Sequence, residues 1–112
     1  MKVVWRVRLS QRAETDFTEI LKWTALHFSI KQAREYAKTL RLAIGALTEG
    51  PEISGVQKRD ELGSGIRTLH VARQGQKGSH FVVFRGAADQ TVEVLRILHE
   101  SMDLIRHLPV HE

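Results

Sequence analysis

Apolar and polar residues alternate along the first ten residues of the chain, in the stretch KVVWRVRLS. In a strand, successive side chains point to opposite faces, so Lys2, Arg6 and Arg8 share one face. The opposite face is apolar and carries Val3, Trp5, Val7 and Leu9. The alternation therefore predicts a first strand that is buried on one side.

The period changes after Ser10, a residue type that often caps the N-terminus of a helix. Apolar residues then recur at helical spacing to about His27 and predict an amphipathic helix. The SIKQ motif at 29–32 matches a capping box and opens a second amphipathic helix, which Gly50 and Pro51 end. Since almost no chain separates the two helices, we expect them to form an antiparallel hairpin.

The chain after Pro51 predicts one loop and three strands. The stretch EISGVQKRDELGSG has no periodic pattern and is expected to be a long loop. The stretches IRTLHVA, SHFVVFRG and TVEVLRIL are rich in β-branched and aromatic residues, and turn-forming residues separate them. They predict an antiparallel meander. The expected fold is α+β with the order β-α-α-β-β-β, in which a helix hairpin packs on one face of a small antiparallel sheet, as a single domain over residues 1–112.

Composition adds a charge and several exclusions. The net charge of +4 favours an acidic partner, either nucleic acid or an acidic protein segment, although a charge of this size also serves solubility. The absence of cysteine excludes disulfides and thiol chemistry, and it fits a reducing cytoplasm. The chain has no run of about 18 apolar residues and no apolar leader, so we expect a cytoplasmic protein without a membrane partner.

A search for catalytic and metal-binding patterns yields little. The sequence has no glycine-rich phosphate loop before a helix and no nucleophile elbow. His99, Asp103, His107 and His111 are spaced by four, which on a helix could bring metal ligands together. Because Pro109 interrupts any helix there, we expect neither a metal nor a cofactor.

Three arginines fall on the predicted meander, namely Arg67, Arg85 and Arg96. Along VEVLRIL, strict alternation places Arg96 on the same face as Val94 and Leu98. An arginine can pass its stem across apolar surface while its guanidinium reaches water or a carboxylate. The three residues thus form either an arginine ladder on a solvated sheet face or a concave basic surface where the sheet meets the tail.

The tail, HESMDLIRHL, mixes ionisable and apolar residues. Asp103 can pair with Arg106 locally or with Arg96 across the end of the last strand, and His99 borders this group. The apolar residues expected to dock the tail onto the sheet are Leu98, Met102, Ile105 and Leu108. The pattern predicts a structural clasp that fixes the path of the tail.

The chain resembles the ParE branch of the ParE/RelE toxin superfamily of bacterial type II toxin–antitoxin modules. The resemblance covers nearly the whole chain, and its most specific parts are LSQRAETDFTEI, RDELGSGIRTL and RILHESMDLIRHL in this order. The seven residues RQGQKGS before HFVVFR are more than the tight hairpin expected at that point.

The resemblance implies a toxin that inhibits DNA gyrase by trapping it with cleaved DNA, without cutting anything itself. It also implies a cognate antitoxin, which we expect to bind in the groove between hairpin and sheet, although the sequence does not identify the contact residues. No sequence-specific contact with nucleic acid is expected. The tail would present the target-binding surface, made of Arg96, His99, Met102, Asp103, Arg106 and His107.

Two alternatives stay open. The RelE branch consists of ribosome-dependent mRNA endonucleases, and RNA cleavage needs an acid, a base and cations around the phosphate. The residues that would serve here are Arg67, Arg85, His99 and Glu100. The only tyrosine, Tyr36, lies on the apolar stripe of the second helix, where we expect it to pack in the core. The other alternative is an inactive relative that only binds its antitoxin.

Overall fold

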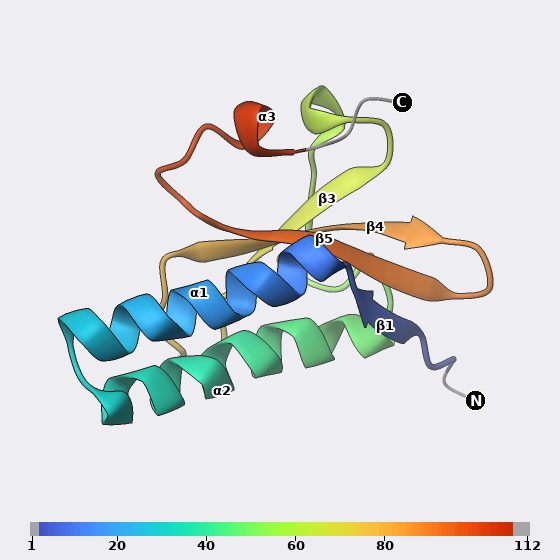
Figure 1. Cartoon of the computed structure of the whole chain (residues 1–112). Coiled ribbons are helices and arrows are strands. Elements are labelled where there is room, and N and C mark those ends of the chain that lie inside the picture. Colours follow the sequence, from blue (N-terminus) through green and yellow to red (C-terminus); the bar gives the residue numbers. More distant parts are fainter. Residues whose placement is uncertain (1–2, 109–112) are drawn as a thin grey trace.

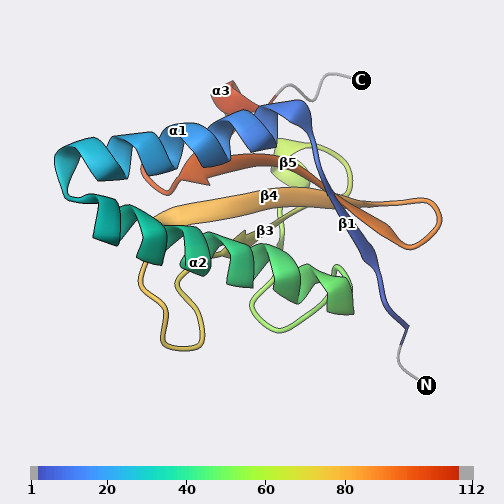
Figure 2. The same cartoon turned by 60° about the horizontal axis from the view of Figure 1, so that its bottom comes forward.

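Two helices lie side by side on one face of a five-stranded sheet in the computed structural model, which describes residues 3–108 (Figures 1 and 2). The helices are α1 (Gln11–His27) and α2 (Ile30–Ala46). The strands are β1 (Arg6–Leu9), β2 (Gln57–Lys58), β3 (Ile66–His70), β4 (His80–Ala87) and β5 (Thr91–His99). Short helical segments are η1 (Leu47–Glu49), η2 (Asp60–Leu62) and α3 (Leu104–His107). Within the described range, no helix is long and apolar enough to cross a membrane.

The predicted α+β class, helix hairpin and antiparallel meander are confirmed, but the sheet is mixed. Its strand order is β1-β5-β4-β3-β2, and β1 runs parallel to β5. A pattern of alternating residues carries no strand direction, so the sequence did not predict this pairing. The segment 52–65 is also more ordered than the predicted loop, since it contains β2, which pairs with β3, and η2, whose Leu62 is buried.

Both helices begin at the predicted caps. The hydroxyl oxygen of Ser10 accepts the backbone N–H of Ala13 at 3.0 Å, and that of Ser29 accepts the N–H of Gln32 at 3.0 Å. At the far end of the hairpin, Gly50 has φ +117° and lies so close to the Trp5 ring that a Cβ would sit 3.2 Å from Nε1. Glycine is suited to this position by both its backbone angle and its size.

Each face of the sheet buries its own apolar cluster. The larger cluster lies between the sheet and the helices and contains Ala13, Leu40, Ala43, Leu47, Leu69, Val71, Val82, Phe84, Val92, Val94 and Ile97. The smaller cluster lies on the opposite face, under η2 and the tail, and contains Leu62, Ile66, Val83, Leu98, Leu104 and Leu108. The tail is therefore part of the folded structure.

A bulge in β5 changes which residues share a face. Val83 of β4 pairs with Arg96, while its neighbour Phe84 pairs with Val94, so Leu95 is an extra residue in β5. As a result Val94 and Ile97 both face the helices, whereas Leu98 joins the cluster on the opposite face. The prediction that Val94 and Leu98 share a face was wrong, because strict alternation does not hold across a bulge.

Beyond the point where β1 ends, the backbone groups of β5 form hydrogen bonds with the side chain that caps α1 and with one side chain inside α1. The Ser10 hydroxyl donates to the carbonyl of Leu95 at 2.8 Å, and an oxygen of Asp16 accepts the N–H of Ile97 at 2.9 Å. The same carboxylate accepts two hydrogen bonds from the guanidinium of Arg96, at 2.8 and 3.0 Å. Backbone groups at this edge thus find partners without a further strand.

Arg96 also holds the tail. Its third hydrogen bond goes from Nη1 to the backbone carbonyl of His107 at 2.5 Å. The side chains of Arg96 and Asp16 are 9% and 13% exposed, so this ion pair is largely removed from water. Asp16 and Arg96 bind two backbone groups, the N–H of Ile97 and the carbonyl of His107. We call this set of four groups the Asp16–Arg96 clasp. It joins a helix, a strand and the tail.

Removing one partner of this clasp should destabilise the fold strongly. We expect Asp16→Ala to lower the free energy of unfolding by about 3–5 kcal/mol, because it leaves a buried guanidinium without a counter-charge. Asp103→Ala is the control. Its pair with Arg106, at 3.6 Å, has side chains 58% and 83% exposed, and its loss together with a helix cap should cost about 1 kcal/mol. Denaturant unfolding of both variants measures the difference, and equal losses would contradict the role of the clasp.

Candidate functional site

The tail presents an exposed surface on a buried base. Leu104 and Leu108 are buried, as the second apolar cluster requires, whereas Met102 and Ile105 are 43% and 62% exposed. The prediction that Leu108 docks the tail is confirmed, and the prediction that Met102 and Ile105 do so was wrong. The two exposed side chains are therefore free to contact another molecule.

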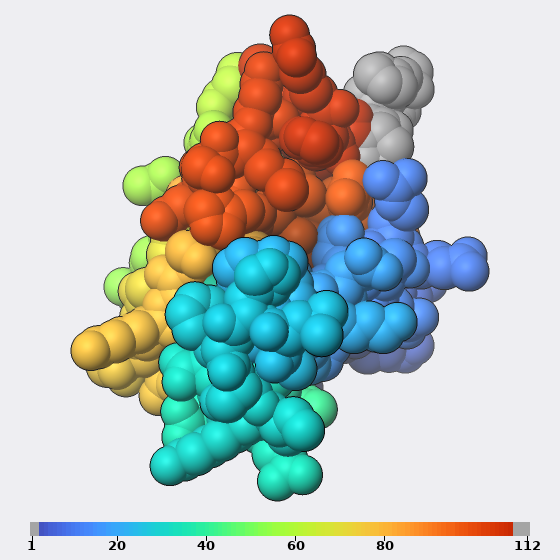
Figure 3. Space-filling model, turned by 60° about the vertical axis from the view of Figure 1, so that its left-hand side comes forward, coloured from blue at the N-terminus to red at the C-terminus, as the bar shows by residue number. Residues whose placement is uncertain are grey.

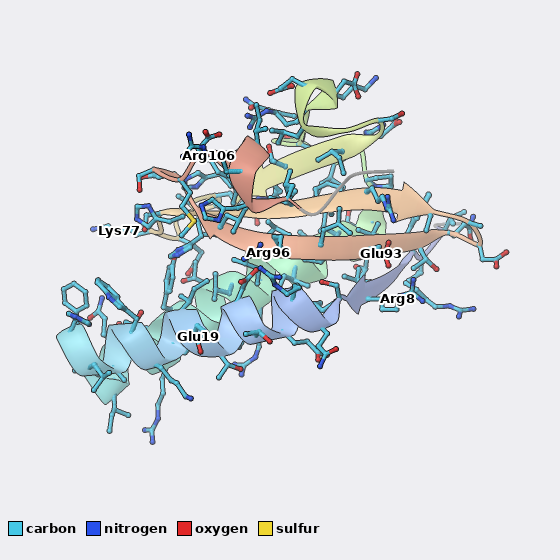
Figure 4. All side chains as sticks on the ribbon, turned by 45° about the horizontal axis from the view of Figure 1, so that its top comes forward. Arg8, Glu19, Lys77, Glu93, Arg96 and Arg106 are labelled. Carbon is cyan, nitrogen blue, oxygen red and sulfur yellow. The ribbon has the colours of Figure 1, made fainter. Side chains whose placement is uncertain are left out.

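Asp103 takes the local one of its two predicted partners. Its carboxylate accepts the N–H of Ile105 at 3.2 Å, which caps α3, and lies 3.6 Å from Arg106. Arg96 is instead paired with Asp16 of α1, a partner for which there is no short-range signal in the sequence. Figure 4 shows the difference, with Arg96 lying between β5 and α1 and Arg106 out on the tail. The ionisable residues of the tail that are exposed are Glu100, Asp103, Arg106 and His107.

The other two strand arginines are engaged elsewhere. Arg67 donates to the carbonyl of Pro51 at 3.0 Å and lies 3.4 Å from a carboxylate oxygen of Glu52. Arg85 shares Glu93 with an arginine of β1, with its Nε 3.3 Å from Oε1. Neither contacts Arg96. The structure thus does not bring the three arginines together into one basic surface.

Of the four residues considered for a nuclease, only His99 and Glu100 lie together. His99 pairs with His80 at the start of β4, whereas Arg85 lies five residues further along that strand. At about 3.3 Å per residue, this separates their backbones by about 16 Å. Arg67 pairs with Phe84 beside Arg85, so it lies at the same distant end of the sheet.

Three histidines and a tyrosine gather at the end of the sheet that carries His99. The hydroxyl of Tyr36, from α2, lies 2.6 Å from Nδ1 of His80, whose ring packs edge-on against that of His99 at 5.2 Å between centroids. In the neighbouring strand, Nε2 of His70 lies 2.7 Å from a carboxylate oxygen of Glu100. We call these five residues the histidine junction. His99 and Glu100 were predicted to belong to a site, whereas Tyr36, His70 and His80 were not.

Burial and neighbouring charges shift three pKa values in the histidine junction. Burial, followed by the nearby His99, lowers the pKa of His80 to about 4, so this imidazole is neutral at pH 7. Burial also raises the pKa of Tyr36, which stays protonated. The hydrogen bond from His70 lowers the pKa of Glu100, which is ionised. The junction therefore combines a protonated Tyr36 and a neutral His80 with one ionised carboxylate.

Tyr36 is tied to the long turn between β3 and β4. Its hydroxyl oxygen accepts the N–H of Ser79 at 3.1 Å. Gly78 approaches so closely that a Cβ there would lie 2.5 Å from a methyl group of Val71 and 3.0 Å from the Tyr36 ring. A hydrogen bond from Thr39 to Gln76, at 3.0 Å, fixes the same turn to α2. The turn, longer than the resemblance suggested, thus packs against the helix hairpin.

Together these elements form a groove of about 1020 Å³ at the closed end of the helix hairpin, beside the connection between α1 and α2. Its apolar lining includes Ile20, Trp23 and Phe28, of which Trp23 is 55% exposed and Phe28 is 67% exposed. Its polar lining includes Tyr36 and two histidines of the junction, His80 and His99. In Figure 3 the cyan helix end, the yellow turn and the orange-red end of β5 with the tail meet on one face.

The charges that line the groove are mixed. Glu19 and Glu35 come from the helices, and Lys38 and Lys77 come from α2 and the turn. Within residues 3–108, no group of three His, Cys, Asp or Glu side chains is arranged to hold a metal ion. His111, one of the four residues considered as metal ligands, lies outside the described residues. The groove thus offers apolar contact and hydrogen bonding to another molecule.

Comparison with known proteins agrees with this fold. The family model described as the ParE toxin of the type II toxin–antitoxin system parDE matches residues 7–104. Toxin ParE1 of Caulobacter vibrioides is 33% identical over 101 residues, which cover 90% of this chain and 95% of that protein. Toxin ParE1 of Mycobacterium tuberculosis is 32% identical over 103 residues, which cover 92% of this chain and 97% of that protein.

Two solved structures share the fold. The chromosomal ParDE toxin–antitoxin system from P. aeruginosa contains a chain with a TM-score of 0.70 and 17% identity, covering 86% of this chain and 96% of that one. The toxin–antitoxin complex RelBE2 from Mycobacterium tuberculosis contains a chain with a TM-score of 0.55 and 20% identity, covering 87% and 99%. The family match and the curated relatives both span most of the sequence. The chain belongs to the ParE family of toxins of type II toxin–antitoxin systems.

Proposed function

We propose that this toxin acts by binding DNA gyrase through its tail, without catalysing a reaction, and that a cognate antitoxin neutralises it. Membership of the ParE family supports gyrase as the target. The observation that carries the non-enzymatic part is the separation of the candidate nuclease residues. Arg67 and Arg85 lie about 16 Å from His99 and are already hydrogen-bonded, so they are badly placed to surround a phosphate whose cleavage His99 would assist as an acid or a base.

The tail suits the target-binding role because it is both fixed and exposed. The Asp16–Arg96 clasp holds the carbonyl of His107, and two buried leucines anchor α3. On this base, Met102, Ile105 and Arg106 point outward. Exposed apolar side chains beside an arginine are typical of the residues that dominate protein interfaces. A surface held in advance also loses little conformational entropy on binding.

The antitoxin would occupy the groove at the closed end of the helix hairpin. Its apolar lining and the exposed rings of Trp23 and Phe28 suit an amphipathic segment that folds as it binds. The net charge of +4 favours an acidic partner. The chains of similar fold come from a ParDE system and a RelBE2 toxin–antitoxin complex, which supports an antitoxin as the partner here.

A second candidate function is ribosome-dependent cleavage of mRNA. It is favoured by one observation, namely that Tyr36, His80 and His99 line the same groove as Lys38 and Lys77. These residue types could supply an acid, a base and cations. Against it, the Tyr36 hydroxyl and Nδ1 of both histidines already have hydrogen-bond partners within the protein.

Separate assays of gyrase supercoiling and ribosome-dependent mRNA cleavage decide between the two functions. We expect the purified chain to inhibit supercoiling, to accumulate gyrase complexes with cleaved DNA, and to leave mRNA intact. The double variant Ile105→Ser with Arg106→Gln should weaken inhibition about tenfold or more, since it alters exposed contacts that carry binding energy. Leu42→Ser, at an exposed apolar site on α2, is the control and should inhibit normally. Codon-specific mRNA cleavage with normal supercoiling would establish the nuclease instead.

Antitoxin binding tests the groove. We expect Trp23→Ser to raise the dissociation constant for the antitoxin at least tenfold, because a large aromatic contact is lost, while Leu42→Ser leaves it unchanged. Association of the parent should slow as salt increases from low to physiological ionic strength, because salt screens the attraction between opposite charges. Unchanged affinity in the Trp23→Ser variant would place the antitoxin elsewhere on the toxin.

A further inference from the structure

Two histidines at the end of the sheet accept hydrogen bonds from the backbone. Nδ1 of His70 accepts the N–H of Ala72 at 3.0 Å, and Nδ1 of His99 accepts the N–H of Ser101 at 3.1 Å. A ring nitrogen can accept a hydrogen bond only while it carries no proton. In both residues the proton of the neutral ring is therefore on Nε2, which in His70 points at Glu100.

The third histidine is held in the same tautomer by a side chain. The hydroxyl oxygen of Tyr36 accepts the N–H of Ser79, and we assign its own proton to Nδ1 of His80, which places the proton of the neutral ring on Nε2. This contact is short, at 2.6 Å, and partly buried. Adding a proton to Nδ1 of His80 would end the donation from Tyr36 and place a charge where burial already opposes one.

The rings of His80 and His99 are also close enough to repel each other once charged. His80 and His99 face each other across β4 and β5, with centroids 5.2 Å apart. His70 packs edge-on against Phe81, the residue after His80, at 4.8 Å. Imidazolium groups at both His80 and His99 would therefore be unfavourable, in addition to the hydrogen bonds that protonation breaks.

Other charged groups around His80 do not remove this penalty. From α1 come Asp16, which is committed to Arg96, and Glu19. From α2 and the turn come Glu35, Lys38 and Lys77, and from β3, β5 and the residue after β5 come His70, His99 and Glu100. The two carboxylates that favour a charged His80, those of Glu100 and Asp16, are weaker influences than burial and His99.

We propose that the histidine junction is an acid-sensitive latch, which keeps the groove in shape only while its three imidazoles are neutral. It fastens the turn after β3 through Ala72 and Ser79, and that turn forms one wall of the groove. Acid would release the turn and weaken binding of a partner seated there. The effect on the partner rests on the proposed antitoxin seat, whereas the effect on the toxin alone does not.

The direction of the pH effect follows from His80. Its pKa in the folded chain, about 4, lies below the ordinary value of 6.5, so the unfolded chain binds more protons between these values. The contribution of neutral His80 to the stability of the folded chain is complete above pH 6.5 and is lost progressively as the pH falls toward 4. At pH 5 this loss increases the unfolding equilibrium constant about tenfold, and at most roughly thirtyfold, after allowance for partial solvent screening.

The test is denaturant unfolding of the toxin alone at pH 7.5 and 5.0, for the parent and for the double variant His80→Asn with His99→Asn. The asparagine amide oxygen can replace Nδ1 as an acceptor but does not titrate. We expect the change from pH 7.5 to 5.0 to increase the unfolding equilibrium constant of the parent about tenfold more than that of the variant. His27→Asn, on the exposed end of α1, is the matched control and should behave like the parent. Equal losses in parent and double variant would overturn the latch.

NMR titration of the parent gives a second readout that does not depend on a variant folding. We expect the His80 ring to remain neutral, with its proton on Nε2, to below about pH 5. Titration near pH 6.5, or a proton on Nδ1, would overturn the proposal. Antitoxin affinity at pH 7.5 and 5.5 then tests the link to the groove. Weaker binding at pH 5.5 by the parent but not by the double variant would support the link, and equal affinity of the parent at the two pH values would refute it. Failure to bind at pH 7.5 would count against the proposed seat and not against the latch.

Discussion

The Asp16–Arg96 clasp solves a problem that the topology creates. Strand β1 pairs with β5 only as far as Val94, so the rest of that edge has no strand to bond with. The N-terminal part of α1 takes this place, because Ser10 binds the carbonyl of Leu95 and Asp16 binds the N–H of Ile97. Arg96 neutralises the carboxylate and extends the connection to the tail. Helix, bulged strand and tail are thus positioned by one small set of polar contacts.

The same two elements connect the two candidate surfaces of the toxin. Helix α1 carries Asp16 in the clasp and, one turn later, Ile20 in the groove. Strand β5 carries Arg96 in the clasp and His99 in both the groove and the histidine junction. A partner in the groove therefore contacts the elements that hold the tail. This arrangement gives a physical route by which an antitoxin could affect the tail without covering it.

Sequence patterns predicted what depends on local periodicity and capping. The two serine caps, the helix hairpin, the three strands of the meander and burial of Leu108 all have short-range signals. The parallel pairing of β1 and the bulge at Leu95 have none, since both depend on which residues meet across strands. For the same reason Asp16 was missed as the partner of Arg96, 80 residues away, and Tyr36 was expected to be a packing residue although it hydrogen-bonds to His80.

Hydrogen–deuterium exchange of Asp16→Asn, compared with the parent, tests most directly whether the clasp unites these parts. The substitution keeps the shape of the side chain but removes its charge. We predict faster exchange at the Ile97 amide and at the amides of 104–108 together, with no change in β3, because the clasp contacts only helix, bulge and tail. Faster exchange confined to Ile97, with the amides of the tail as protected as in the parent, would contradict the account.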